Sequence, residues 1–330
     1  MSTKFLAVNE IKNHVLTNKL KYKYKGTRII TFVFRCFFLV GLSFVMLYPI
    51  LFMFSGAFKS AIDVYDLSVV WLPKNYSLEA MGLALDALDF QNAFIKTLII
   101  LVPSVLLQVA SSILAAYAFA RFKFPFQKLM FVLLIFSIIV PTSSIIIPLF
   151  TQFNDYSFLG ISGFFGVSIN FLNTPVPFYV MAATGFGIRS GLYIFILRQF
   201  FSAIPKELEE AALIDGAGNA TTFVKVMLPN AVNAIVTVTI LSVVWYWNDY
   251  YMSAMFLNSN FPLSVQLTML NSSLVTLADR SSGIASTTLY LLRDSVVESA
   301  CLVVSAPLIA VYIFFQKYLV ESIEKTGIVG

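Results

Sequence analysis

Long apolar stretches with few or no charged residues most constrain how this chain can fold. Residues 129–150 carry no charge, and a helix of that length crosses the ~30 Å hydrocarbon core of a bilayer at ~1.5 Å per residue. Over the whole chain, 58% of residues are hydrophobic and 12% are charged, against about a quarter charged in an ordinary soluble domain. The pattern predicts an all-α integral membrane protein.

Six apolar segments are long enough to span a bilayer as helices. Helices are expected because unpaired backbone groups in lipid are costly, and the alternation of a barrel strand is missing. The expected spans are residues 31–57, 94–120, 129–150, about 176–197, 231–257 and 296–319. They divide the chain into a basic N-terminal tail (1–30), a first span (31–57), an outer loop (58–93), a five-helix core (94–319) and a C-terminal tail (320–330).

The lysines and arginines are distributed unequally about these spans. Both termini in the cytoplasm would put most of the 22 basic residues on that side, and the remainder are Lys59, Lys74, Lys96, Arg189, Arg280 and Arg293. Cytoplasmic loops of membrane proteins are enriched in basic residues. We therefore expect cytoplasmic termini, and we interpret the basic tail as a determinant of topology and not as a nucleic-acid site.

The inventory of reactive side chains excludes several chemistries. His14 is the only histidine, so neither a His/Cys metal site nor a His-based triad is expected. Cys36 and Cys301 both lie in apolar spans, where they pack as small hydrophobic residues. The chain has no G-x-x-x-x-G-K-[ST] loop. We expect no catalysis, metal or cofactor in this chain, and energy for transport must come from an ion gradient or another subunit.

Two expected outer loops leave two interpretations open. Residues 58–93 are acidic, with Asp63, Asp66, Glu79, Asp86 and Asp89, and residues 258–295 form a second long loop. Both loops are either solvated connectors or parts of a docking surface for an extracellular partner.

The fourth expected span contains an arginine among glycines. Gly185, Gly187 and Gly191 surround Arg189 in an otherwise apolar stretch. Glycine permits a helix break or close helix packing, and an intramembrane arginine suggests a functional site. The interpretation we favour is structural: an arginine satisfied by backbone carbonyls or a carboxylate at a break.

The cytoplasmic loop over residues 198–230 has the strongest local signals. Pro205 followed by acidic residues predicts a helix start. Gly216 and Gly218 can adopt the left-handed conformation that ends a helix, and Asn219 can cap a second helix. Ala211 and Ala212 leave a small-sided face. Two short helices with this chemistry predict a docking projection below the membrane.

This loop resembles the E-A-A loop of permeases in binding-protein-dependent ABC importers. The similarity rests on Glu210-Ala211-Ala212, Gly216, Val226 and Leu228-Pro229, with valine where the family usually has isoleucine. Three further segments resemble the carbohydrate branch, that of the maltose-type second permease: residues 198–209, residues 115–125, and Trp247-Asn248-Asp249-Tyr250. The end of the chain departs from the family, because residues 327–330 lack its usual lysine and Ser322 replaces a usual glycine.

The resemblance implies a type I importer permease with six transmembrane helices in the bacterial plasma membrane. It implies a cytoplasmic ATPase dimer that holds ATP and Mg, a second homologous permease that is a different chain, and an extracellular solute-binding protein. By the same resemblance, Glu210 is the polar anchor, Ala211, Ala212 and Ala217 are packing contacts, Asp215 is a cap or ion-pair member, and Gly216 is the obligatory turn.

The solute pathway is less defined by the sequence. Sugars bind aromatic faces and polar hydrogen-bonding groups, so the candidate contacts are Arg189, Trp245, Trp247, Asn248, Asp249 and Tyr250. Aromatic residues near a span end also form interfacial belts. By helix rise, Asp249 lies ~27 Å from the inner end of its span and Arg189 ~13 Å from that of its own, which disfavours an ion pair between them.

Two other function classes remain possible from the sequence. One is an ABC importer permease for a non-sugar solute. The other is an ATP-independent secondary transporter, although such proteins commonly have inverted repeats, and no internal repeat is seen here.

Overall fold

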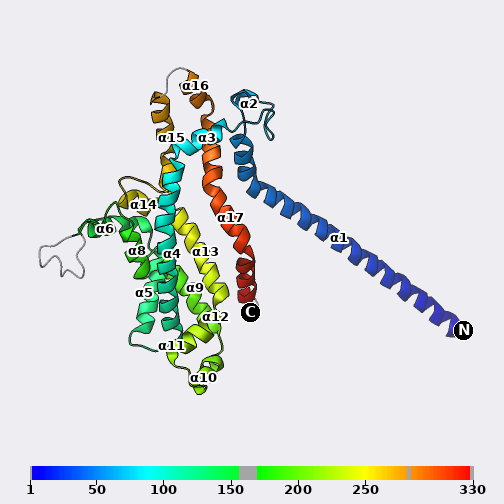
Figure 1. The fold of residues 1–330 in the computed structure, drawn as a ribbon. Coiled ribbons are helices and arrows are strands. Elements are labelled where there is room, and N and C mark those ends of the chain that lie inside the picture. Colours follow the sequence, from blue (N-terminus) through cyan, green and yellow to red (C-terminus); the bar gives the residue numbers. More distant parts are fainter. Residues whose placement is uncertain (1, 156–168, 281–283, 328–330) are drawn as a thin grey trace.

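The computed structural model describes residues 2–155, 169–280 and 284–327, and helices make up most of that part (Figure 1). The expected second outer loop and C-terminal tail include residues 281–283 and 328–330, which lie outside the described residues. The elements are α1 (Ser2–Ala57), α2 (Ala61–Tyr65), α3 (Glu79–Ala87), α4 (Phe90–Arg121), α5 (Gln127–Ile139), α6 (Thr142–Asn154), α8 (Val176–Ala183), α9 (Ser190–Ala203), α10 (Lys206–Ile214), α11 (Asn219–Thr222), the π-helix η2 (Phe223–Met227), α12 (Leu228–Asn230), α13 (Val232–Trp247), α14 (Tyr251–Phe256), α15 (Leu263–Arg280), α16 (Ile284–Leu291) and α17 (Arg293–Gly327).

Helix α4 is central to the bundle. It packs against α8, α9 and α13, and its buried positions include Thr97, Leu101, Ser104, Gln108 and Ser112. Residues three and four apart lie on one face of a helix. One face of α4 therefore supplies the contacts that hold these helices together, and several of its buried residues are polar.

The interior divides into two apolar clusters. The first joins α3, α4, α8, α14, α15 and α17 and includes the buried Phe178, Phe256 and Leu292. The second surrounds α9 and the start of α13, with Tyr193 and Phe201 fully buried. Figure 1 shows α10 and α11 at one end of the bundle and α2, α3, α15 and α16 at the opposite end.

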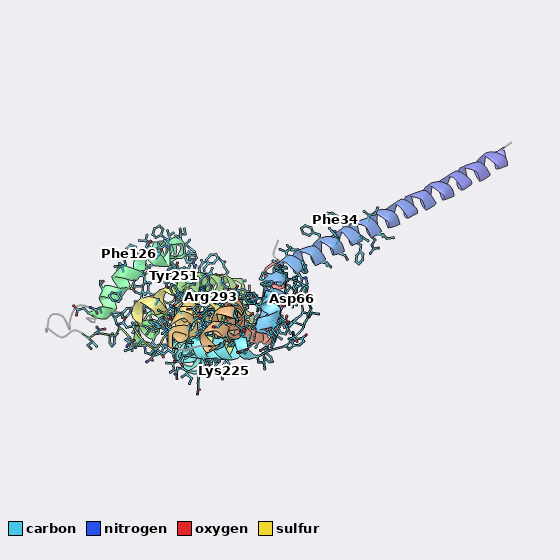
Figure 2. All side chains as sticks on the ribbon, turned by 90° about the horizontal axis from the view of Figure 1, so that it is seen from above. Phe34, Asp66, Phe126, Lys225, Tyr251 and Arg293 are labelled. Atoms are coloured by element: carbon cyan, nitrogen blue, oxygen red, sulfur yellow. The ribbon has the colours of Figure 1, made fainter. Side chains whose placement is uncertain are left out.

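Helix α1 differs from the other long helices in its exposure. Its candidate span, Arg28–Ala57, has a most apolar window in which no residue is buried. Figure 2 shows the stretch around Phe34 projecting from the bundle, and the Phe34 side chain is 67% exposed. Near its C-terminal end α1 packs on α17, where Ser299 Oγ donates to the Ala57 carbonyl at 3.3 Å. Residues 2–30, expected as a tail, continue this helix.

The all-α prediction is confirmed, and the predicted count of six spans is not. In the described residues, three helices are long and apolar enough to cross a membrane: Arg28–Ala57, Phe90–Arg121 and Arg293–Tyr318. The number rises to at most five if each of two bent helix pairs forms one span. The expected third, fourth and fifth spans are each divided in the structure.

The third expected span breaks at a proline. Helix α5 ends at Ile139, α6 begins at Thr142, and the axes of the two parts differ by 104°. Pro141 has no N–H to donate, and proline disfavours helical geometry in the residue before it. Val140 accordingly has extended backbone angles of φ −65° and ψ 120°. The apolar composition extends through this break, so hydropathy alone did not reveal it.

The fifth expected span also contains a break. Helix α13 ends at Trp247, and α14 begins four residues later at Tyr251. The Asp249 carboxylate accepts the backbone N–H groups of Met252 and Ser253, at 3.3 and 2.9 Å. These N–H groups belong to the first turn of α14 and have no partner within the helix. Asp249 therefore stabilises the start of a new helix.

Both expected outer loops contain helices. The first holds α2 and α3, and the described part of the second holds α15 and α16. Helix α15 packs against α3, α4 and α17, and its first residue, Leu263, donates its N–H to Thr97 Oγ1 at 2.9 Å. These helices at the end opposite α10 are thus held to the bundle by packing and hydrogen bonds.

Candidate functional site

The α10 projection, residues 205–218, forms as the sequence predicted at its start and its turn. Pro205 is the N-cap of α10, and two glutamates lie in the first turn. At the end of the helix, Gly216 has φ +82°. The N–H of Ala217 donates to the Ala212 carbonyl at 3.0 Å, and the N–H of Gly216 donates to the Leu213 carbonyl at 3.1 Å. These two bonds are the Schellman pattern that ends helices at a left-handed residue.

The second half of this loop differs from the prediction. Gly218 has φ −75° and ψ 163°, so it is extended and not left-handed, and it is the N-cap of α11. Asn219, expected as the cap, is the first helical residue. One left-handed residue already reverses the chain at Gly216, so a second was not needed. The loop then continues through η2 to α12.

The predicted coupling residues lie on one small, mostly exposed surface. Glu210, Ala211, Asp215 and Gly216 are exposed, while Ala212 and Ala217 are half-buried. Three apolar residues of α10 beside them were not predicted from the sequence: Leu208, Leu213 and Ile214, which are exposed by 42%, 49% and 86%. The signal available was their place on a short helix outside the apolar spans. Exposed apolar side chains gathered on a projection are typical of a protein-binding surface.

Glu209 joins the α10 projection to α4. Its carboxylate accepts the Tyr117 hydroxyl at 3.0 Å and lies 3.4 Å from Arg121 Nε. The Arg121 Nη2 also donates to the Ile204 carbonyl at 2.6 Å. Tyr117 and Arg121 are four residues apart and lie on one face of α4. The sequence indicated Glu210 as the polar anchor for a partner. It gave no indication that Glu209 holds α10 to α4.

The fourth expected span is broken where its glycines predicted. Helix α8 ends at Ala183, α9 begins at Ser190, and Gly185 and Arg189 have φ of +80° and +60°. We name residues 184–189 the α8–α9 break. The Arg189 guanidinium lies 4.3 Å from the ring centroid of Trp245, a cation–π contact. Within the described ranges, no ion pair joins Arg189 to Asp249.

A buried glutamine closes the other side of this break. Gln108 is fully buried, and its Nε2 donates to Ser190 Oγ at 2.6 Å and to the Ile188 carbonyl at 3.3 Å. The Tyr246 hydroxyl donates to Gln108 Oε1 at 2.9 Å. We name Gln108, Ser190 and Tyr246 the Gln108 latch. It ties α4, α9 and α13 together at the point where the fourth span is interrupted.

Position 187 must be glycine because there is no room for a side chain beside the Gln108 latch. A Cβ built on Gly187 would overlap Gln108 Oε1 and would lie 2.7 Å from the Tyr246 hydroxyl and 3.0 Å from the Ala182 Cα. No side chain fits there unless the latch moves. Gln108 was not among the residues predicted from the sequence. A strongly polar residue inside an apolar span was the feature that could have indicated it.

The remaining candidate solute contacts do not share one surface. Trp247 is 5% exposed and donates its indole N–H to the Val304 carbonyl of α17 at 3.2 Å. Asn248 is exposed, and its Nδ2 donates to the Val244 carbonyl. The Tyr250 ring lies 5.7 Å from that of Tyr251. Asp249 is engaged with the start of α14.

One cavity lies at the end of the bundle opposite α10 (Figure 1), among α1, α2, α15 and α17. It has a volume of about 650 Å³ and is lined by Phe52, Lys59, Val64, Asn271, Arg293, Asp294, Ser295, Val297 and Glu298. Arg293 donates to Asn271 Oδ1 at 3.1 Å. Over the described part of the chain, no group of three or more His, Cys, Asp and Glu side chains could hold a metal ion.

The helical bundle with its α10 projection has the architecture of a transport permease. Residues 108–325 match the family of binding-protein-dependent transport system inner membrane components, and the chain belongs to this family. Members are ABC transporter permeases, transport components whose ATPase is a separate subunit. The predicted resemblance is confirmed, and the chain is a multi-pass protein of the bacterial plasma membrane.

Individual proteins similar to this chain include two curated permeases and a solved transporter. The osmoprotective compounds uptake permease protein GgtD of Synechocystis sp. is 29% identical over 242 residues, 70% of this chain and 76% of that protein. The melibiose/raffinose/stachyose import permease protein MelC of Bacillus subtilis is 30% identical over 268 residues, 80% of this chain and 86% of that protein. A chain in the crystal structure of a bacterial ABC transporter involved in import of the acidic polysaccharide alginate matches with a TM-score of 0.68 and 24% identity, covering 88% of this chain and 96% of that one. That structural likeness shows the fold.

Proposed function

We propose that this chain forms half of the translocation pathway of an ABC importer for a sugar or oligosaccharide. Family membership defines an importer permease, and the names of relatives supply the solute class: melibiose, raffinose and stachyose for one, alginate for the other. The observation that carries the proposal is the exposed α10 projection at one end of the helical bundle (Figure 1). A non-sugar solute is the second candidate, because another relative is named for osmoprotective compounds.

The partners in this proposal follow from membership of the importer permease family. The α10 projection inserts into a cleft on a cytoplasmic ATPase dimer, which binds ATP and Mg. Glu210 is the polar contact, Ala211, Ala212 and Ala217 allow close approach, and Asp215 forms a cap or ion pair. A second, different permease completes the pathway, and an extracellular solute-binding protein delivers the solute. The proposed topology keeps six crossings, counting divided helices as spans, with both termini in the cytoplasm.

A continuous set of contacts can transmit motion from α10 to the pathway. Movement of α10 acts on α4 through Glu209, which contacts Tyr117 and Arg121. Further along α4, Gln108 contacts the α9 side of the α8–α9 break through Ser190 and the Ile188 carbonyl. Ser111 Oγ donates to the Ala182 carbonyl on the α8 side of the break. Packed side chains transmit displacement because protein interiors are dense and resist compression. Closure of the ATPase dimer would thereby shift the α8–α9 break.

Arg189 and Trp245 are the proposed solute contacts at that break. Both side chains are exposed in this single chain, yet each lies in or beside an apolar span. A charged residue at membrane depth faces a protein interface or a water-filled cavity and avoids lipid. A guanidinium beside an indole ring offers hydrogen-bond donors and an aromatic surface, which suit a sugar. Asn248, Asp249 and Tyr250 stay candidate contacts in the connection between α13 and α14, and Trp247 is a candidate only if the core around it opens.

The docking step is tested by adding bulk to the exposed face of α10. We expect Ala211→Phe to abolish co-purification of the ATPase and ATP-driven uptake, because the added ring prevents close approach of the cleft. The permease should still insert and show the thermal stability of the unaltered chain. Thr268→Phe is the control for ATPase co-purification, since Thr268 is an exposed residue of α15 at the opposite end of the bundle. Normal ATPase yield and uptake with Ala211→Phe would refute the docking proposal.

The solute class is tested separately with the assembled transporter. Proteoliposomes containing both permeases and the ATPase, with the solute-binding protein outside and ATP inside, should accumulate a labelled oligosaccharide. An osmoprotective compound offered under the same conditions should not be accumulated. Uptake of the osmoprotective compound alone would favour the second candidate while leaving the importer assignment intact.

A further inference from the structure

Residues 66–74 of the first outer loop form an apolar surface to which the proposed function assigns no role. We name this segment the Trp71 loop. Leu67 is 96% exposed and Leu72 is 75% exposed, and Val70 and Trp71 are nearly half exposed. Four apolar side chains exposed within six residues are unusual on a soluble surface, where contiguous apolar patches mark interaction sites.

The Trp71 loop folds back along the outer part of α1. The Trp71 ring lies 5.3 Å from the Tyr48 ring and 6.1 Å from the Phe44 ring, measured between centroids. Tyr48 lies nine residues before the end of α1 at Ala57, a distance of ~13 Å along a helix. Both contacts fall inside the candidate span Arg28–Ala57. The loop therefore reaches the level of a segment that is long and apolar enough to span a membrane.

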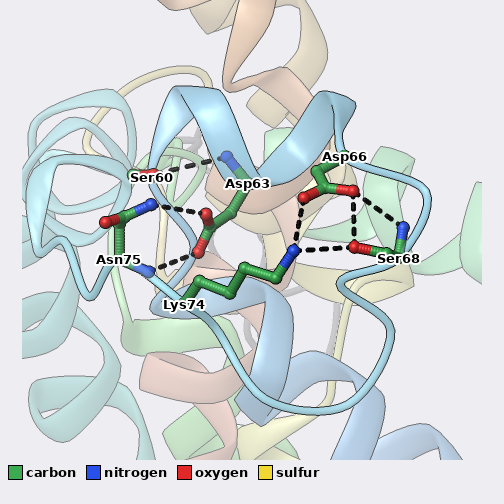
Figure 3. A network of polar contacts seen from close by, with 6 residues as sticks. All are labelled: Ser60, Asp63, Asp66, Ser68, Lys74 and Asn75. Carbon is green, nitrogen blue, oxygen red and sulfur yellow. Dashed lines mark hydrogen bonds and ion pairs between the residues drawn. The ribbon is translucent and has the colours of Figure 1, made fainter.

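A polar network holds the loop in this position (Figure 3). The Asp63 carboxylate accepts the Asn75 backbone N–H at 2.7 Å and its Nδ2 at 2.9 Å. Asp66 accepts Lys74 Nζ at 2.7 Å and the Ser68 hydroxyl at 2.7 Å. Because donors surround both carboxylates, the pKa of each lies below its usual value. They stay ionised at neutral pH, and the network keeps both ends of the loop fixed.

The fixed ends determine what the apolar side chains can do. A loop free to rearrange would bury Leu67 and Leu72 against the bundle, because exposing them to water is unfavourable. Here Ser55 Oγ also donates to the Val70 carbonyl at 3.3 Å, which binds the middle of the loop to α1. Leu67 and Leu72 are thus presented outward beside a transmembrane helix.

We propose that the Trp71 loop is a membrane-interface anchor, with Leu67, Trp71 and Leu72 inserted at the boundary between headgroups and acyl chains of the outer leaflet. Tryptophan and tyrosine are enriched at that boundary, where their rings are amphipathic. The loop is continuous with the exposed surface of α1, none of whose most apolar window is buried. Lipid is the occupant because both apolar surfaces share one depth. The inference requires that α1 spans the membrane, and it is independent of the solute.

Site-directed spin labelling in lipid nanodiscs tests the anchor. A nitroxide is attached at Leu67→Cys or, separately, at Leu72→Cys, with Cys36 and Cys301 replaced by alanine. Leu67 and Leu72 are so exposed that a label at either position should not disturb the core. The label at Glu79→Cys, an exposed residue of α3 outside the loop, is the control. Collision rates with oxygen, which concentrates in lipid, and with a water-soluble nickel chelate are measured for each label.

For each label, the oxygen collision rate is divided by the collision rate with the nickel chelate. We expect this ratio at residues 67 and 72 to be at least several-fold higher than at residue 79. The permease should be measured alone and also in the complete complex, with both preparations giving this result. Equal ratios at the loop and at residue 79 would overturn the anchor. Shielding from both reagents that occurs only when the second permease or the solute-binding protein is present would also overturn it, because the surface would then be a protein contact.

Discussion

The α10 projection and the α8–α9 break both interrupt helices at glycines, yet they need glycine for different reasons. Gly216 in the α10 projection has φ +82° with nothing within 4 Å of a Cβ added there. Gly187 in the break has no room for a Cβ, because Gln108 Oε1, the Tyr246 hydroxyl and the Ala182 Cα enclose it. The first glycine is required by backbone conformation, and the second is required by packing.

The surroundings of the two sites differ in the same way. The α10 projection exposes its apolar side chains, so its surface is completed by another molecule. The α8–α9 break is held on its buried side by the Gln108 latch, so its geometry is completed by this chain. A substitution at the first site should disturb association, whereas a substitution at the second should disturb the stability of the permease itself.

The largest effect is expected for Gly187→Val, which challenges the packing half of this comparison. The branched side chain would displace the Gln108 latch, and overpacking of this kind costs typically about 1–3 kcal/mol, with the upper end expected because backbone is among the atoms overlapped. A lower melting temperature in detergent would show it. Gly82→Ala is the control: nothing lies within 4 Å of a Cβ added there, inside α3, so a stabilisation of up to ~1 kcal/mol is expected. An unchanged melting temperature for Gly187→Val would remove the packing argument.

The next effect is expected at the contact between the α10 projection and α4. Glu209→Ala removes the partner of Tyr117 and Arg121, and a hydrogen bond to a charged group contributes about 1.5–3 kcal/mol. Thermal unfolding should show a stability loss toward the lower end, since the Glu209 side chain is 18% exposed. The matched control is Glu210→Ala, whose exposed side chain should leave thermal stability unchanged and weaken ATPase binding. The reverse pattern would mean that Glu210 holds the fold and Glu209 faces the partner.

A smaller effect on stability is expected for Gly216→Ala, which examines the conformational half of the comparison. A Cβ in the left-handed region costs about 1–2 kcal/mol, and the strain should lower ATP-driven uptake by disturbing the end of α10. Gly216→Asn should retain more activity, because asparagine tolerates this conformation. Gly218→Ala should be neutral, since Gly218 is extended with open space around it. Equal uptake by all three variants would show that the turn conformation is unimportant.

The smallest effect is expected in the network of the first outer loop. Lys74→Ala removes the largest contribution to the lowered pKa of Asp66, so that pKa should return toward its ordinary value of 3.8. A lowered native pKa stabilises the folded loop above the ordinary pKa, and this stabilisation is lost as pH falls through the native value. The difference in melting temperature between the two proteins should therefore be constant from pH 7 to about 5 and should shrink below 3.8. A difference that grows on acidification would contradict this sign.

The all-helical membrane class of the chain, the start of α10 and its terminal turn could be predicted from the sequence, because each depends on short segments. Apolar runs of about twenty residues predicted an all-helical membrane protein because burial in lipid requires internally paired backbone. The helix beginning after Pro205 and the turn at Gly216 were predicted for the same local reason, since a proline and a glycine set their own backbone angles. The order of the motifs along residues 198–230 then identified the family.

Contacts between residues far apart in the sequence could be identified only in the folded chain. Gln108 and Tyr246 are 138 residues apart, and Tyr117 and Glu209 are 92 residues apart. Glu209 and Glu210 are chemically identical, so the choice between them depends on which side of α10 faces α4. The return of Trp71 to α1 and the division of the third and fifth spans likewise followed from contacts and local backbone geometry that hydropathy does not encode. Hydropathy records how much a segment gains by leaving water, and it does not record which neighbour it finds there.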